Sequence, residues 1–474
     1  MSALLLSLVL PAWAADPPAA DGPDAPPAPA APESSDAPPA DAEPPAAAPD
    51  APEADAPEAP EAPEAPEAPA TEAPEAPEAP ETPATGELPP VGRNPVPEVM
   101  GVKTTIGRHR RARGERREDR TTMRPYGQLQ VFSTVWDQDE DVQADPATYG
   151  DPEADPGFQL ARARFGFQGR LPVEAGQKSA VDFALQFGVG TPFDVLVVGT
   201  QDVGLVDAYL RYGVRTGVGP TSVSLGLAKV PFSRDALMSS SDLPFMERSV
   251  GPANLVSVRD VGVTASQAFV FGHSDEDAPQ IVVRAGAYNG NASFLGDQDP
   301  GLMYAVRAEL AKGDTYRTWN PDKRMAAGLA GSVLLNDALS TRTFAWNTDG
   351  LVRVGPWSLL GELGRATLTP TDVTVGAPEV VANTTRTSWV AATSVWIGVD
   401  GPNGVEVAVK ASGFDDNLRL KDNGDVLIVH GGAIWRNVLP FLDIGAAYIH
   451  REELQGSTIK NDTIHLTTQI RPAR

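Results

Sequence analysis

Charged side chains recur at every second position of several apolar segments. Of all residues in this sequence, they are the clearest candidates for a chemical role. Arg162 and Arg164 alternate with apolar residues in ARARFGFQG, and Arg307 and Glu309 do so in YAVRAELA. Arg211 holds the same kind of position in VDAYLRY. Fixed charges of this kind attract or repel ions without making or breaking bonds. They indicate electrostatic handling of small solutes and not catalysis.

A second group of charges lies in a run without alternation, KVPFSRDALMSSSDLPFMERSVGPANLVSV, residues 229–258. The candidate site residues of this run and of the position directly after it are Lys229, Arg234, Asp235, Asp242, Glu247, Arg248 and Arg259. Its prolines exclude a paired central strand. Structureless segments longer than about 12–15 residues inside an ordered domain are usually functional. We therefore expect this run to be a functional loop.

Groups for other chemistry are scarce. The absence of cysteine excludes disulfides, thiolate metal sites and a cysteine nucleophile. The five histidines are scattered and lie in no recognisable catalytic or metal-binding motif. We predict no enzymatic activity, no metal and no cofactor, although an enzyme site assembled across several strands remains an alternative.

The elements that position these charges have a period of two residues. In VDFALQFGV (181–189), apolar residues alternate with Asp182, Ala184, Gln186 and Gly188, which is typical of a strand with one apolar face. Such segments occur near 126–137, 158–170, 180–189, 203–213, 221–230, 258–270, 280–288, 301–311, 324–335, 341–354, 357–368, 387–399, 404–414, 425–436, 441–451 and 461–471. The pattern thus predicts sixteen strands.

Alternation alone permits a soluble β-sandwich or a membrane barrel. Charges in the middle of strands favour the barrel, because a water-filled lumen accepts them while the apolar face meets lipid. Connections also alternate between long and short, with exceptions at 312–323 and 336–340. A β-protein in lipid must close its sheet, and sixteen strands leave an aqueous channel. The predicted fold is all-β, a transmembrane antiparallel β-barrel of about 16 strands over residues 126–474.

Aromatic residues fall near several predicted strand ends, where a membrane barrel carries an aromatic girdle. They are Tyr212, Phe232, Trp357 and Trp435.

The N-terminal quarter of the chain has no apolar periodicity after its first residues. Residues 1–14 read as a signal peptide, and residues 15–100 as a disordered Pro/Ala/Glu-rich linker. Residues 101–125 form a basic periplasmic segment with seven arginines in 107–120. We expect an outer-membrane protein with this segment in the periplasm. Cell-wall contact, binding to anionic lipid and a merely solubilising tail stay open, and we expect no nucleic acid partner.

Residues 229–258 allow a closer prediction. As the third long loop of the barrel, the run would fold into the lumen, with Phe232, Leu243, Phe245 and Met246 pinning it to the wall and its charges facing the channel. A loop that points outward and caps the barrel rim is the alternative. The segments LAKVPFSRDALMSSSDLPFMERS, RDVGVTAS, AYNGNA and DAYLRYG resemble the phosphate-selective porins O and P. That resemblance implies a homotrimeric outer-membrane porin with an inward third loop.

The expected function is a water-filled channel for small solutes or ions, with phosphate or other anions among the candidates. The resemblance implies that phosphate-selective members line the pore with basic rows. Here acidic residues interrupt the basic ones, and residues 126–474 contain 28 basic and 40 acidic residues. A non-conducting outer-membrane barrel that acts as an adhesin or an envelope tether is the alternative.

Overall fold

The computed structural model describes residues 121–137, 157–173, 179–190, 204–272, 278–290, 301–322, 324–337, 341–371, 382–400, 402–420, 424–455 and 462–471. The predicted signal peptide, the linker and residues 101–120 of the basic segment lie outside these ranges.

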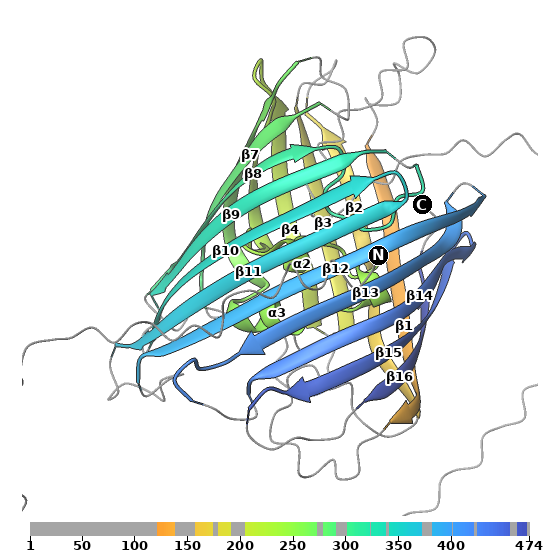
Figure 1. Cartoon of the computed structure of the whole chain (residues 1–474). Helices are drawn as coiled ribbons and strands as arrows, with labels where there is room; N and C mark the ends of the chain where they lie inside the picture. Colours follow the sequence, from red (N-terminus) through yellow and green to blue (C-terminus); the bar gives the residue numbers. More distant parts are fainter. Residues whose placement is uncertain are drawn as a thin grey trace, which may run out of the picture. The chain divides into compact units, whose positions relative to one another are not determined.

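Sixteen antiparallel strands form a closed barrel in which each strand pairs with its neighbours in the chain and β1 pairs with β16 (Figure 1). The strands are β1 (Thr122–Asp137), β2 (Gly157–Pro172), β3 (Ser179–Gly190), β4 (Gly204–Arg215), β5 (Pro220–Lys229), β6 (Arg259–Val270), β7 (Gln280–Tyr288), β8 (Met303–Lys312), β9 (Ala326–Asp337), β10 (Thr341–Val354), β11 (Trp357–Pro370), β12 (Thr384–Asp400), β13 (Asn403–Asp415), β14 (Val426–Leu439), β15 (Leu442–Glu453) and β16 (Thr463–Ile470). The predicted fold class and strand number are confirmed.

The period-two pattern maps onto the two faces of the barrel wall. In β2, Phe165 and Phe167 are 55% and 47% exposed, while Arg164 and Gln168 on either side of them are buried. The pleat of a strand turns successive side chains to opposite faces, so one face meets the surroundings of the barrel and the other its interior. Tyr212, Trp357 and Trp435 are exposed, as a girdle requires, but Phe232 is buried. Its assignment to the girdle was wrong, because it lies in the loop that enters the barrel.

Strand β1 begins at Thr122, four residues before the predicted barrel boundary at residue 126. Pro125, which lacks a backbone N–H, suggests a break at this point in the sequence. Over residues 122–128, however, β1 pairs with β2 alone, and its pairing with β16 starts at Leu129. A proline is tolerated where a strand has a partner on one side only.

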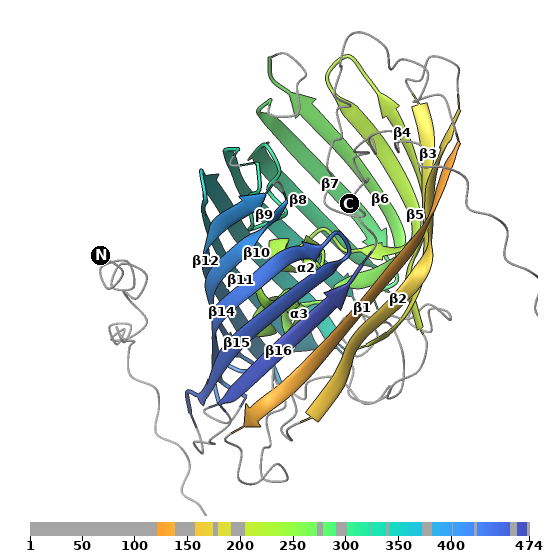
Figure 2. The same ribbon diagram turned by 90° about the vertical axis from the view of Figure 1, so that its right-hand side faces the viewer.

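Residues 230–258, called the constriction loop below, connect β5 to β6 and run inside the barrel (Figure 2). The loop contains α2 (Arg234–Leu237), the 3₁₀ turn η2 (Pro244–Met246) and α3 (Val250–Leu255). Its base is closed by a hydrogen bond from Val230 N to Val258 O of 3.0 Å. Among the described residues, no helix is both long and apolar enough to cross a bilayer.

Candidate functional site

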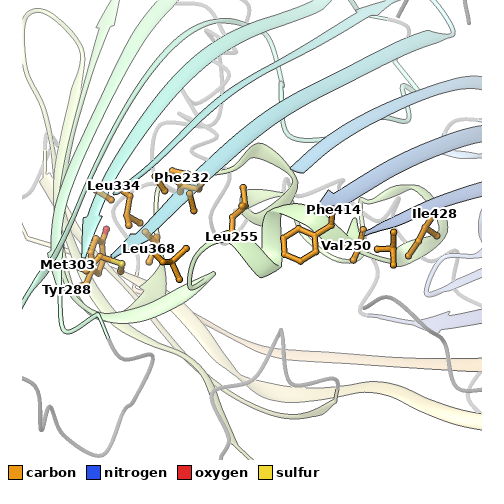
Figure 3. Packing of buried hydrophobic residues seen from close by; sticks show 14 of the residues in the cluster. Phe232, Val250, Leu255, Tyr288, Met303, Leu334, Leu368, Phe414 and Ile428 are labelled. Atoms are coloured by element: carbon orange, nitrogen blue, oxygen red, sulfur yellow. The ribbon is translucent and has the colours of Figure 1, made fainter. Parts of the chain in front are cut away.

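Apolar side chains anchor the constriction loop to the barrel wall in three clusters. Figure 3 shows the first, in which Phe232, Val250 and Leu255 lie among residues of strands between β7 and β15. Leu237, Met238 and Leu243 form the second cluster with side chains of β10, β11 and β12, among others. Phe245 and Met246 pack on Ala408, Ile434 and Ala447 in the third. The four predicted anchors thus all contact the wall, because many inward positions facing the loop are apolar.

Phe245 and Met246 also have left-handed backbones, with φ of 58° and 59°. Such values are uncommon for residues other than glycine and cost free energy. The third apolar cluster and the stacking of Phe245 on His430, with ring centroids 5.7 Å apart, hold the two residues in this conformation.

Cationic side chains of the wall donate hydrogen bonds to backbone carbonyls of the loop. The donors and acceptors are Lys229 to Leu237 O and Met238 O, Arg307 to Phe232 O, Arg436 to Ser241 O and Leu243 O, Arg162 to Met246 O, and Lys410 to Glu247 O. Buried carbonyls need such partners, since an unpaired one costs about as much as a lost hydrogen bond. These cations therefore hold the loop in place.

A network of buried ion pairs fixes the start of the loop. Arg234 lies 2.7 Å from Asp349 and 3.0 Å from Glu309. Arg307 makes two hydrogen bonds to Asp349, of 2.6 and 2.9 Å, and Arg284 lies 3.3 Å from Glu309. Burial lowers the pKa of Arg234, but the charges of Glu309 and Asp349 outweigh it and raise the pKa above its usual value. Arg234 therefore remains a cation inside the barrel.

Contacts within the loop join α2 to the residues that directly precede α3. The Asp235 carboxylate accepts hydrogen bonds from the backbone N–H and the hydroxyl of Ser249, at 3.2 and 3.1 Å. Arg248 donates to the carbonyls of Asp235 and Met238. Asp235 N in turn donates to the Glu362 carboxylate of β11, at 3.0 Å. These bonds make residues 234–249 one folded unit.

The remaining loop charges contact different parts of the interior. Asp242 accepts a hydrogen bond of 3.2 Å from Trp319 Nε1. Glu247 lies 3.4 Å from His430 Nε2, and its side chain is 26% exposed. Partial burial raises the pKa of Glu247, but the hydrogen bond and charge of His430 and the charge of Lys410 outweigh it, so that the pKa is lowered to about 2. Glu247 is therefore ionised at neutral pH.

Of the predicted residues on the wall, Arg162, Arg164, Arg307 and Glu309 contact the loop, and Arg164 does so through Ser240 at 3.3 Å. Two others contact the wall itself. Arg259 pairs with Asp207 at 3.2 Å, and Arg211 lies over the ring of Tyr209, 5.2 Å from its centroid.

The sequence predicts that the charged side chains of the loop face the lumen. In the structure, most of them face protein instead. Arg234, Asp235, Asp242 and Arg248 are buried against protein, and Glu247 alone among the predicted loop charges is partly exposed. The apolar anchors press the loop onto the wall, so these charges meet wall side chains and loop carbonyls. Their part in lining a solute path stays a prediction.

Several residues that hold the loop were not singled out in the sequence as site residues. They are Asp349, Lys410, Arg436, Tyr316 and Trp319. Asp349, Lys410 and Arg436 occupy inward positions of strands in which polar and apolar side chains alternate. The same period-two signal therefore identifies them. Tyr316 and Trp319 lie in a connection that is long although a short turn was expected there. That unexpected length was the sequence signal that could have identified them. Among the described residues, no group of histidine, aspartate and glutamate is arranged to hold a metal ion.

Comparisons with known proteins agree with this architecture. The barrel is similar to OmpF of Salmonella typhi in complex with daunomycin, with a TM-score of 0.50, 11% identity, and coverage of 75% of this chain and 99% of that chain. An anion-selective porin from Comamonas acidovorans gives a TM-score of 0.48, with 12% identity over 75% and 100% of the two chains. The outer membrane channel DcaP of Acinetobacter baumannii gives 0.48, with 13% identity over 74% and 97%. At these identities the OmpF similarity establishes the fold alone.

Among curated proteins, a sequence search found no match to the chain. The sequence model of one family, phosphate-selective porin O and P, matches residues 136–324. This range runs from the end of β1 to the connection before β9, and it includes the whole constriction loop. Porins are channels and not enzymes. Over residues 136–324, the chain is thus similar to the phosphate-selective porin O and P family.

Proposed function

We propose that the barrel is an outer-membrane porin whose water-filled channel lets small solutes or ions diffuse, with the constriction loop as its narrow part. The observation that carries this proposal is the loop itself, which crosses the interior of a closed sixteen-stranded barrel and is tied to several strands of its wall. Barrels of this strand number leave room for an aqueous channel. A loop fixed inside one sets the channel's cross-section.

The charges of the interior favour weak selectivity over a dedicated phosphate path. Wall cations such as Arg307, Arg436 and Lys410 direct hydrogen bonds at loop carbonyls or at carboxylates. Those donors are therefore directed at protein acceptors and not at a solute. Neighbouring carboxylates such as Asp349 and Glu406 offset part of the positive field. Phosphate and other inorganic anions thus stand among several candidate solutes.

Single-channel recording tests the proposal. The full chain, reconstituted in planar lipid bilayers, should produce stepwise current increases. Reversal potentials under a salt gradient then give the ion preference. A chain that inserts as a folded barrel, shown by its heat-dependent gel mobility, but gives no current steps would contradict the channel.

A non-conducting barrel that serves as an adhesin or an envelope tether is the second candidate. The observation that favours it is the dense packing of the loop, in which nearly all of residues 230–250 are buried. The same recordings separate the two, because a barrel filled by its loop gives no current.

Glu247 should contribute to ion preference, because it is the partly exposed charge among the predicted loop residues. Replacing it in Glu247→Gln should shift the reversal potential toward anion preference, since a charge in a narrow passage acts more strongly than in bulk water. Glu452→Gln, which removes an equal charge at an exposed site on β15, is the matched control. Equal reversal potentials in the two variants would show that Glu247 does not face the ion path.

We further propose that the porin is a homotrimer embedded in outer-membrane lipid, with residues 15–100 as a periplasmic linker that contacts the cell wall. The composition of the linker, rich in proline, alanine and glutamate, supports a chain without a core of its own. Chemical cross-linking of the reconstituted protein tests the trimer.

Deleting residues 16–90 should leave the heat resistance of the barrel unchanged, because this composition lacks the apolar residues that offset the entropy cost of ordering. The same deletion should abolish retention of the detergent-solubilised protein on isolated cell wall. A barrel that unfolds at clearly lower temperature would show that the segment packs on it, and unchanged retention would contradict the tether.

A further inference from the structure

The connection between β8 and β9, residues 313–325, differs from the short turns after β10 and β14 at the same end of the barrel. Connections that follow even-numbered strands share one end, and the constriction loop, which follows β5, enters from the other. After β10 and β14 the chain turns within two residues. In the longer connection after β8, by contrast, several side chains are buried, with Thr318, Trp319 and Asn320 only 1–2% exposed.

Buried contacts place this inward connection against the barrel wall just inside the mouth. Arg353 donates to the carbonyl of Trp319 at 3.1 Å, and the hydroxyl of Thr318 donates to Glu406 at 2.7 Å. Trp319 also contacts Trp396, with ring centroids 5.5 Å apart. Arg353, Trp396 and Glu406 lie within four residues of their strand ends, which is within roughly 13 Å of the mouth at about 3.3 Å per residue.

The same connection also contacts the constriction loop at its start. Arg234 of α2 donates to the carbonyl of Thr315 at 2.7 Å. Its guanidinium carbon lies 5.1 Å from the centroid of the Tyr316 ring. Tyr316 in turn is part of the apolar cluster that contains Leu237, Met238 and Leu243.

Trp319 provides a second point of contact, at the middle of the loop. Its indole N–H donates to Asp242, and the Arg436 guanidinium lies 5.7 Å from its ring centroid. Arg436 itself donates to the loop carbonyls of Ser241 and Leu243, both at 2.8 Å. One tryptophan thus joins the inward connection, the wall and the loop.

We propose that residues 313–322 form a second constriction element, which enters from the mouth opposite to the constriction loop and holds that loop across the lumen. Tyr316 and Trp319 are its positioning residues. The inference rests on the proposed channel function and extends it, because conductance then depends on two segments from opposite ends. Without the second segment, Arg234 and Asp242 lose buried partners, and the loop loses part of its apolar packing.

Paired substitutions test this inference on the full chain. The variant Tyr316→Ala/Trp319→Ala should raise single-channel conductance by a factor of roughly two and add open-channel current noise, because the loop no longer keeps one position. Trypsin should also cleave the folded variant after Lys229, Arg234 or Arg248, which are buried in the native barrel. The matched control, Tyr304→Ala/Trp357→Ala, removes the same ring types at exposed positions of the wall and should behave as the native chain.

Native-like conductance, noise and trypsin resistance in the first variant would overturn the proposal. If the native chain gives no current, the channel function fails, while cleavage of the loop still decides whether the connection holds it. Should the alanine pair fail to fold, Trp319→Phe keeps an aromatic ring and removes the N–H that donates to Asp242. That variant should show smaller increases in conductance, current noise and trypsin cleavage. If none of these increases occurs, the proposal is contradicted.

Discussion

Deleting residues 236–246 should raise the single-channel conductance roughly two- to threefold, because the middle of the constriction loop occupies lumen that a sixteen-stranded barrel otherwise leaves to water. The deleted segment contains the anchors Leu237, Leu243 and Met246, which fill space against the wall. The deletion joins Asp235 directly to Glu247, and the native geometry allows this junction. Arg248 Nη1 donates to the carbonyl of Asp235, and Ser249 N lies 3.2 Å from the Asp235 carboxylate, so the chain ends left by the deletion are close together.

The control removes residues 372–381 from the connection between β11 and β12, a similar length of chain outside the constriction loop. Conductance is measured in planar bilayers after heat-dependent gel mobility has shown that both variants are folded. A conductance equal to that of the native chain would show that the narrowest point is elsewhere. We expect the barrel to keep its fold, because its strands pair with one another and not with the loop.

Asp349→Ala should have the largest effect of any single substitution on stability. Its carboxylate accepts hydrogen bonds from Arg234 at 2.7 Å and from Arg307 at 2.6 and 2.9 Å, and all three side chains are fully buried. Removing one partner of a buried ion pair leaves uncompensated charge and costs about 3–5 kcal/mol. Here two guanidiniums lose a partner, so we expect a value in the upper part of that range.

Asp337→Ala is the matched control. Asp337 pairs with Arg342 at 2.8 Å, but both side chains are more than half exposed. Exposed pairs contribute about 0–1 kcal/mol, since water and salt screen them. The unfolding temperature on gels should thus fall clearly for Asp349→Ala and little for Asp337→Ala. A similar small change in both would mean that the buried network does not stabilise the folded protein.

The barrel and its strand number could be predicted from the sequence because the signal is local. A pleated strand turns alternate side chains to opposite faces, so ARARFGFQG by itself indicates which residues face outward. The same signal identified β9, β10 and β11, although the connections around them break the alternation of lengths. Proline and length marked the constriction loop, and its aromatic and aliphatic residues were correctly predicted as anchors.

Only the tertiary structure decided which charges meet. Arg234 and Asp349 are separated by 115 residues, and Arg436 lies 193 residues from the Leu243 carbonyl to which it donates. Such pairs depend on how the sheet closes and on where the loop crosses it, and neither is encoded in a local pattern. For the same reason, the sequence alone places Tyr316 and Trp319 in an unusually long turn and does not indicate that they are buried. Their burial follows from the space that the closed barrel leaves beside the loop, and that space exists only once all sixteen strands have paired.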